Sequence, residues 1–93
     1  MCGISGYISD RNLVQKNALS KTINLMKLRG PDAHNYTLKE YPTKQVALLH
    51  SRLNIIDLHD RSNQPFIDDN LTLIFNGEIY NFLEIKKKLK HKY

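Results

Sequence analysis

Residues 13–32 read LVQKNALSKTINLMKLRGPD, and the spacing of apolar residues in this stretch sets the expected fold class. The apolar residues recur every three or four positions, which predicts an amphipathic helix over residues 13–28. The motif Arg29-Gly30-Pro31-Asp32 then ends the helix, because glycine suits the left-handed position after a helix and proline cannot continue one. The residues expected on the core-facing side are Val14, Ala18, Leu19, Ile23, Leu25, Met26 and Leu28.

Short strands are expected before and after this helix. Residues 2–9, CGISGYIS, combine β-forming residues with Gly3 and Gly6, where close approach of a neighbouring backbone is expected. The other segments with strand-like patterns are 35–38, 45–49, 51–57 and 71–75, and a polar loop covers 59–65.

A second helix is predicted over residues 78–93. Phe82, Ile85 and Leu89 share one helical face, and Asn81 and Glu84 stand at the spacing of a capping box. Strands and helices in this order predict the α+β class, with helix packed on sheet. A chain of 93 residues with a hydrophobic fraction of 41% fits one small domain.

Composition excludes several classes of function. No apolar run approaches the ~20 residues that a membrane-spanning helix needs, and the first residues lack the pattern of a signal peptide. The single cysteine leaves no internal disulfide and fits a reducing compartment. A cytoplasmic protein without a membrane partner is therefore expected.

The net charge of +5 lies almost wholly at the C-terminal end. Five lysines against one glutamate leave +4 in residues 84–93, so residues 1–83 carry only +1. A lysine cluster of this kind is typical of a solvated helix face, so nucleic acid is not expected as a partner. The five lysines are Lys86, Lys87, Lys88, Lys90 and Lys92.

Cys2 directly follows the initiator Met1 and precedes Gly3. Removal of Met1 would leave a chain that begins with a residue carrying both a thiol and a free α-amino group. Cys2 is thus either a reactive residue or a small hydrophobic residue that opens a strand, and its position alone leaves both interpretations open.

Asn76-Gly77 and Arg52 also allow two interpretations each. Asn76-Gly77 is either a turn or, between a strand and a helix, a source of amide donors for an oxyanion hole. Arg52 is either exposed on the polar face of a strand or a clamp for a carboxylate. No metal site is expected, because the four histidines stand far apart and there is no second cysteine. His50 and Ser51 are not expected to form a catalytic dyad, because adjacent residues of a strand point to opposite faces.

Four motifs together carry a family resemblance: MCGISGYI at 1–8, LRGPDAHN at 28–35, HSRLNIIDL with QPF at 50–58 and 64–66, and LIFNGEIYN at 73–81. In this order the chain resembles the N-terminal glutaminase domain of class II (N-terminal nucleophile) glutamine amidotransferases. Within that family it is most similar to glutamine-hydrolysing asparagine synthetases, which Arg29-Gly30-Pro31-Asp32 favours over the sister enzymes. The resemblance implies the N-terminal part, incomplete, of an αββα sandwich of the N-terminal nucleophile hydrolase type.

Carried onto these positions, the resemblance implies hydrolysis of L-glutamine with release of ammonia. Cys2 would be the nucleophile, with its own α-amino group as the general base, since such an amine has a pKa of about 8. Arg52 would bind the α-carboxylate of glutamine, and the side chain of Asn76 and the N–H of Gly77 would form the oxyanion hole. The turn at residues 29–32 would brace the site. The residues expected to line the substrate pocket are Leu53, Asn54, Ile55, Ile56 and Glu78.

The resemblance also implies parts that are not expected within residues 1–93. These are an aspartate that binds the amino group of glutamine, the remaining strands of the sandwich, and a synthetase domain, in the same chain or a separate one, that uses ATP and magnesium. Residues 1–93 are thus expected to be a partial glutaminase domain without a cofactor of its own, whose ammonia would amidate aspartate in the full-length enzyme. The alternative is an inactive remnant, or a small basic binding module that uses the lysines of residues 86–92.

Overall fold

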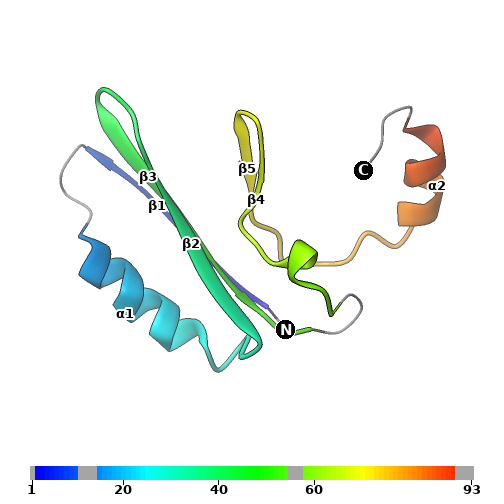
Figure 1. Cartoon of the computed structure of the whole chain (residues 1–93), viewed down its shortest axis with the longest axis horizontal. Helices are drawn as coiled ribbons and strands as arrows, with labels where there is room; N and C mark the ends of the chain where they lie inside the picture. The colour runs from blue at the N-terminus through cyan, green and yellow to red at the C-terminus, as the bar shows by residue number, and fades with distance from the viewer. Residues whose placement is uncertain (1, 11–14, 55–57, 90–93) are drawn as a thin grey trace.

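A computed structural model describes residues 2–10, 15–54 and 58–89. These residues form a three-stranded sheet, a separate two-stranded hairpin and helices (Figure 1), which confirms the α+β class. The elements are β1 (Gly3–Asp10), α1 (Lys16–Met26), β2 (Ala33–Glu40), β3 (Lys44–Arg52), the short 3-10 helix η1 (Asp60–Ser62), β4 (Phe66–Asp68), β5 (Leu71–Leu73) and α2 (Phe82–Lys88).

The three-stranded sheet is antiparallel, with the strand order β1-β3-β2. β3 is the central strand, and the last residue pair that it forms with β1 joins Ser51 to Gly3. Because successive side chains of a strand alternate between the two faces, the central strand presents two different sets of residues. Ala47, Leu49 and Ser51 point to one face, and Leu48, His50 and Arg52 point to the other.

α1 covers the first of these faces and forms the hydrophobic core with it. Leu19, Ala47 and Leu49 are buried, and Ile23, Met26 and Leu38 pack against them. The Ser51 hydroxyl donates to the Met26 carbonyl at 3.0 Å and ties the end of the helix to β3. The predicted core side is confirmed for Leu19, Ile23 and Met26.

The same prediction is wrong for Ala18, Leu25 and Leu28. Ala18 is exposed, and the side chains of Leu25 and Leu28 are 81% and 96% exposed. Only one narrow stripe of the helix meets the sheet, and α1 ends at Met26, so Leu28 already lies in the following turn. Val14 and the other residues of 11–14 lie outside the described part of the chain.

The β4–β5 hairpin lies on the side of the sheet away from α1 (Figure 1). Asp69 in its turn has a φ of 44°, a left-handed conformation that aspartate tolerates. β4 was not predicted, although Asp69-Asn70 between two apolar runs is a hairpin signal. The predicted strand at 71–75 is confirmed only as far as Leu73.

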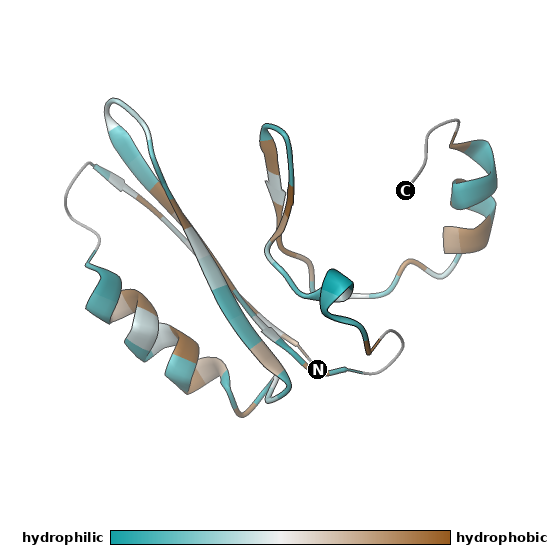
Figure 2. Cartoon of the chain, in the orientation of Figure 1, coloured by the Kyte–Doolittle hydropathy of each residue, from teal (hydrophilic) through white to brown (hydrophobic). Residues whose placement is uncertain are grey.

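α2 is shorter than predicted, because residues 78–81 are not helical and Leu89, which follows the helix, is extended. Residues 90–93 of the predicted helix lie outside the described ranges. Asn81 is the N-cap but makes no capping hydrogen bond with its side chain, so the capping box is not formed. Figure 2 shows apolar residues on the hairpin and at the start of α2, and no residue of α2 is buried. The prediction of helix packed on sheet therefore holds for α1 alone.

The loops correct two further expectations, the strand at 51–57 and the loop at 59–65. Ser51 and Arg52 end β3 instead of opening a new strand, Leu53 and Asn54 are not in a strand, and residues 55–57 lie outside the described part. The polar loop at 59–65 contains η1. No helix in the described ranges is long and apolar enough to span a membrane.

Glycines also correct the sequence analysis. Gly30 does not have a positive φ, so its expected left-handed conformation is wrong. Glycine is required there by space, since a Cβ would stand 2.4 Å from the carbonyl carbon and oxygen of Ser51. At Gly3 the close neighbour is a side chain and not the expected backbone, since a Cβ would lie 2.7 Å from Ser51 Oγ. At Gly6 the expected close approach is wrong, because the nearest atom would be Leu48 Cδ2 at 3.6 Å.

Candidate functional site

Cys2 stands immediately before β1, beside the residue that follows β3. The Leu53 N–H donates to Cys2 Sγ at 3.4 Å, and the Leu53 carbonyl oxygen lies 3.9 Å from the same sulfur. The cysteine is half-buried and forms no disulfide. The sulfur thus has a hydrogen-bond donor, the Leu53 N–H, and a hydrogen-bond acceptor, the Leu53 carbonyl, nearby. This arrangement suits a group that gains and loses a proton.

Arg52 ends β3 and is buried, with 6% of its surface exposed. The residue before it, Ser51, pairs with Gly3, which is the residue after Cys2. Its Nη1 donates to the His59 carbonyl at 2.9 Å and to Asn63 Oδ1 at 2.8 Å. The interpretation of Arg52 as a surface residue is therefore wrong. A guanidinium held in this way can offer its remaining donors to a carboxylate.

The turn at residues 29–32 packs on the carboxyl end of β3. Gly30 lies against the Ser51 backbone, and the Asp32 N–H donates to the Arg52 carbonyl at 2.9 Å. The carboxylate of Asp32 accepts a hydrogen bond from the Asn54 N–H at 2.6 Å. These contacts fix the backbone of residues 52–54 from one side, which is the bracing role that the sequence predicted for this turn.

The segment after β5 runs beside η1 (Figure 1). The Phe75 N–H donates to Gln64 Oε1 at 2.6 Å, and the Phe75 backbone lies next to the ring of His50. Burial lowers the pKa of His50, the Phe75 backbone raises it by less, and the positive charge of Arg52 lowers it further. Asn76 and Gly77 follow directly after this anchored residue.

The structure brings some of the predicted site residues together and leaves others apart. Cys2, Arg52, Leu53 and Asn54 meet where β3 ends. Asn76, Gly77 and Glu78 form no hydrogen bond with other described residues, and Gly77 and Glu78 are exposed. Their places at the oxyanion and at the pocket wall stay predictions. Ile55 and Ile56 lie outside the described residues.

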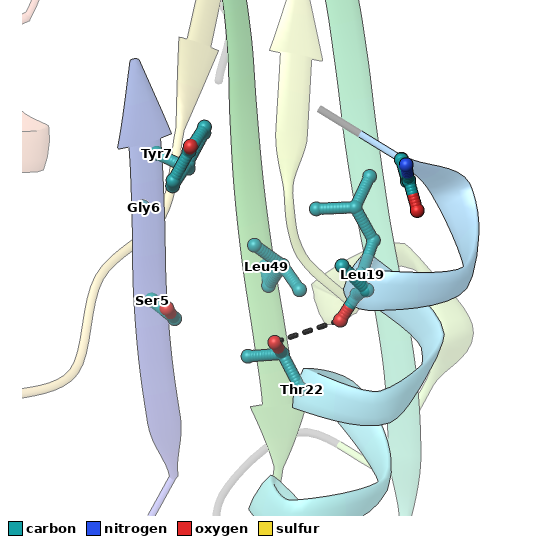
Figure 3. Close-up of a pocket in the computed structure, with 8 residues that line it drawn as sticks. Ser5, Gly6, Tyr7, Leu19, Thr22 and Leu49 are labelled. Carbon is teal, nitrogen blue, oxygen red and sulfur yellow. Dashed lines mark hydrogen bonds between the residues drawn. The ribbon is translucent and has the colours of Figure 1, made fainter. Parts of the chain in front are cut away.

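A pocket of about 240 Å³ lies between α1 and the sheet, on the face opposite to Arg52 (Figure 3). The Thr22 hydroxyl donates to the Ala18 carbonyl at 2.9 Å, so this polar group at the pocket is already bonded within the helix. None of the predicted site residues lines this pocket. Its lining consists of Ser5, Gly6, Tyr7, Gln15, Ala18, Leu19, Thr22 and Leu49.

Within the parts of the chain that the structure describes, no group of three or more histidine, cysteine, aspartate or glutamate residues is placed to hold a metal ion.

The family described as glutamine amidotransferase domain matches residues 1–93, which is the whole chain. The chain therefore belongs to the glutamine amidotransferase domain family, and the resemblance inferred from the four motifs is confirmed. No solved structure matches the chain.

Curated relatives extend this result. The chain is 37% identical to asparagine synthetase (glutamine-hydrolyzing) 1 of Bacillus subtilis, over 99% of this chain and 15% of the relative. It is 32% identical to asparagine synthetase (glutamine-hydrolyzing) 3 of the same organism, over 97% of this chain and 15% of the relative. It is also 32% identical to amidase chry2 of Gibberella zeae, over 100% of this chain and 16% of the relative. The chain thus spans about a sixth of the length of these relatives.

Sequence reasoning missed the residues that hold the site in place. Asn63 and Gln64 bind Arg52 and Phe75, and His50 lies against the backbone of Phe75. Gln64 belongs to the QPF motif and His50 to the HSRLNIIDL motif. Both residues are therefore part of the motifs that carry the family resemblance, but neither of them was given a role from the sequence. Nothing in their spacing indicates that they meet, because each contact joins residues at least 11 positions apart.

Proposed function

We propose that this chain forms the glutaminase part of an asparagine synthetase and hydrolyses L-glutamine through the thiol of Cys2. The observation that carries the proposal is the contact of the Cys2 thiol with Leu53, the residue that directly follows the buried Arg52 at the end of β3. Membership of the glutamine amidotransferase domain family and similarity to glutamine-hydrolyzing asparagine synthetases support the choice of substrate.

The proposed reaction begins when removal of Met1 frees the α-amino group of Cys2. This amine takes the thiol proton while the sulfur attacks the carboxamide carbon, so that a C–S bond forms and the carbonyl oxygen becomes an oxyanion. The Asn76 side chain and the Gly77 N–H stabilise this oxyanion, where one donor can be worth about 3 kcal/mol. The protonated amine gives its proton to the nitrogen of the substrate, the C–N bond breaks, and ammonia leaves.

Water completes the cycle by attacking the thioester that remains on Cys2. The C–S bond breaks, glutamate is released, and the sulfur regains its proton. Throughout, Arg52 holds the α-carboxylate of the substrate with the donors that do not bind His59 and Asn63, and Asp32 keeps Asn54 in place at the pocket. Leu53, Ile55, Ile56 and Glu78 complete the proposed wall.

The wider assignment follows from the same proposal. Residues 1–93 would be part of a type-2 glutaminase domain with the αββα architecture of N-terminal nucleophile hydrolases, acting in the cytoplasm. The ammonia would pass to a synthetase domain, which binds ATP and magnesium and amidates aspartate. No step in residues 1–93 uses that nucleotide or metal.

The test is labelling of Cys2 by a diazoketone analogue of L-glutamine, followed by intact mass. We expect loss of Met1, one adduct, and protection by L-glutamine but not by D-glutamine. Arg52→Gln should lower the labelling rate at least about tenfold, because hydrogen bonds to a charged group are worth about 1.5–3 kcal/mol. Lys21→Gln, which removes an exposed positive charge on α1, is the matched control and should label at the wild-type rate.

Two results would contradict the proposal. If Met1 is retained, the α-amino group of Cys2 is locked in a peptide bond and cannot be the base. If the analogue labels the Arg52→Gln and wild-type chains equally, with no protection by L-glutamine, the thiol does not lie in a glutamine site.

A further inference from the structure

The loop from His59 to Gln64 contacts both halves of the proposed site. On one side it accepts two hydrogen bonds from Nη1 of Arg52, through the His59 carbonyl and the Asn63 side chain. On the other side Gln64 Oε1 accepts the Phe75 N–H at 2.6 Å. Two consecutive side chains, Asn63 and Gln64, thus hold the proposed carboxylate-binding residue and the segment that carries the proposed oxyanion donors.

Phe75 needs such a partner because the strand has already ended. β5 stops at Leu73, so the Phe75 N–H has no place in a strand ladder, and an unpaired backbone donor is free to turn toward solvent. The hydrogen bond that the Phe75 N–H donates to Gln64 fixes the direction of the peptide unit just before Asn76. The ring of His50, on β3, lies against the backbone of Phe75 as well. The orientation of the next two residues is set from this point.

We propose that Gln64 is a positioning residue, which rests on the function proposed above. By binding the Phe75 N–H, its side chain aims the donors of Asn76 and Gly77 at the carbonyl of the substrate, while Asn63 does the same for Arg52 and the α-carboxylate. Gln64 therefore acts on the chemical step and Asn63 on substrate binding. Donors displaced by about 1 Å cost on the order of a hundredfold in rate, so a single acceptor oxygen is enough to matter.

The experiment compares four variants of the full chain. Gln64→Met keeps the length of the side chain and removes the acceptor oxygen, and Gln64→Glu keeps the oxygen. Asn63→Leu removes the acceptor for Arg52. Gln15→Met makes the same chemical change at an exposed glutamine on the other side of the sheet, and serves as the matched control. Each variant is measured by hydrogen exchange of the Phe75 amide and by the kinact and KI of the diazoketone analogue at Cys2.

We expect Gln64→Met to raise the exchange rate of the Phe75 amide and to lower kinact at least about tenfold, with KI within twofold of the wild type. Gln64→Glu should restore both values, and Gln15→Met should change neither. Asn63→Leu should raise KI at nearly constant kinact. A merely structural role for Gln64 would move KI and kinact together and would not be rescued by Gln64→Glu.

The outcomes separate the two proposals. Wild-type exchange of the Phe75 amide, or wild-type kinact, in Gln64→Met would overturn the role of Gln64 while the labelled wild type still supports the glutaminase. Absence of labelling in the wild type itself would refute the glutaminase proposal, and the positioning role with it.

Discussion

His50 is a buried imidazole on the same face of β3 as Arg52, with 1% of its surface exposed. Loss of hydration on burial lowers the pKa of His50 from its usual 6.5, and the neighbouring guanidinium adds to this effect. The folded chain therefore keeps His50 neutral under conditions where the unfolded chain already binds a proton. Folding and the protonation of this ring are linked.

The linkage predicts how stability depends on pH. Between the lowered pKa of the folded state and 6.5 the unfolded chain binds more protons, so the free energy of unfolding rises with pH in this window. The contribution of the neutral His50 ring to the free energy of unfolding is fully present above pH 6.5 and is lost as the pH falls below 6.5. We expect His50→Gln to reduce the difference in unfolding free energy between pH 7.5 and 5.5, as measured by urea denaturation at both pH values.

The control for this prediction is Asn24→Gln, which changes an exposed residue of α1 and removes no titratable group. It should leave the difference between the two pH values as in the wild type. A His50→Gln chain with the full wild-type pH dependence would show that the buried ring is not its source.

At the scale of elements, the turn between α1 and β2 is the contact that fixes the end of β3. Gly30 approaches the Ser51 backbone so closely that no side chain fits between them. Pro31 forms a bridge with Arg52, and the Asp32 N–H bonds the same residue. The turn therefore connects the helix on one face of the sheet to the candidate site on the other.

We expect Gly30→Ala to destabilise the chain by about 1–3 kcal/mol, because the added methyl group must push strand backbone aside. The matched control is Gly6→Ala on β1, where the new Cβ would lie 3.6 Å from Leu48, an ordinary contact distance. Alanine there should change stability by less than about 1 kcal/mol, since it also restricts the unfolded chain. Urea denaturation of both variants gives the two values, and equal destabilisation would refute the packing argument.

The whole molecule is more open than its length requires. Its radius of gyration is 14.8 Å, whereas a compact domain of this length has about 12 Å. Among the described residues, β2, β3 and α1 share a core and β1 pairs with β3, while β4 and β5 pair with each other and α2 contains no buried residue. Stability is thus concentrated in one layer and the helix that covers it.

This distribution predicts the order of hydrogen exchange. We expect amides of β3 (Lys44–Arg52) to exchange slowest and those of α2 (Phe82–Lys88) to exchange near the rate of an unfolded chain, because short helices are marginal without packing. Exchange followed by mass spectrometry of peptides measures both. Strong protection of α2 that weakens on dilution would contradict this expectation and indicate that a second copy covers the helix.

Local sequence patterns were enough to predict most elements and the family. The helical spacing of Leu19, Ile23 and Met26 identified α1 and its buried side, and the strand-like runs identified β1, β2 and β3. The motifs that carry Cys2, Arg52 and Asn76-Gly77 identified the glutamine amidotransferase domain family, because residue types and their spacing can be seen in the sequence without a structure. Among the elements whose predicted lengths failed, β5 and α2 have few tertiary contacts to define their ends.

Only the tertiary structure decided which residues are buried and which of them meet. Arg52 and His50 read as polar strand residues, yet both are buried, because the ladder with β1 and β2 places them in the centre of the sheet and the loop from His59 to Gln64 closes over Arg52. Gln64 has no apparent role until Phe75 lies beside it. These contacts join residues far apart in the chain, and a one-dimensional pattern carries periodicity and turn chemistry but not the pairing of distant segments.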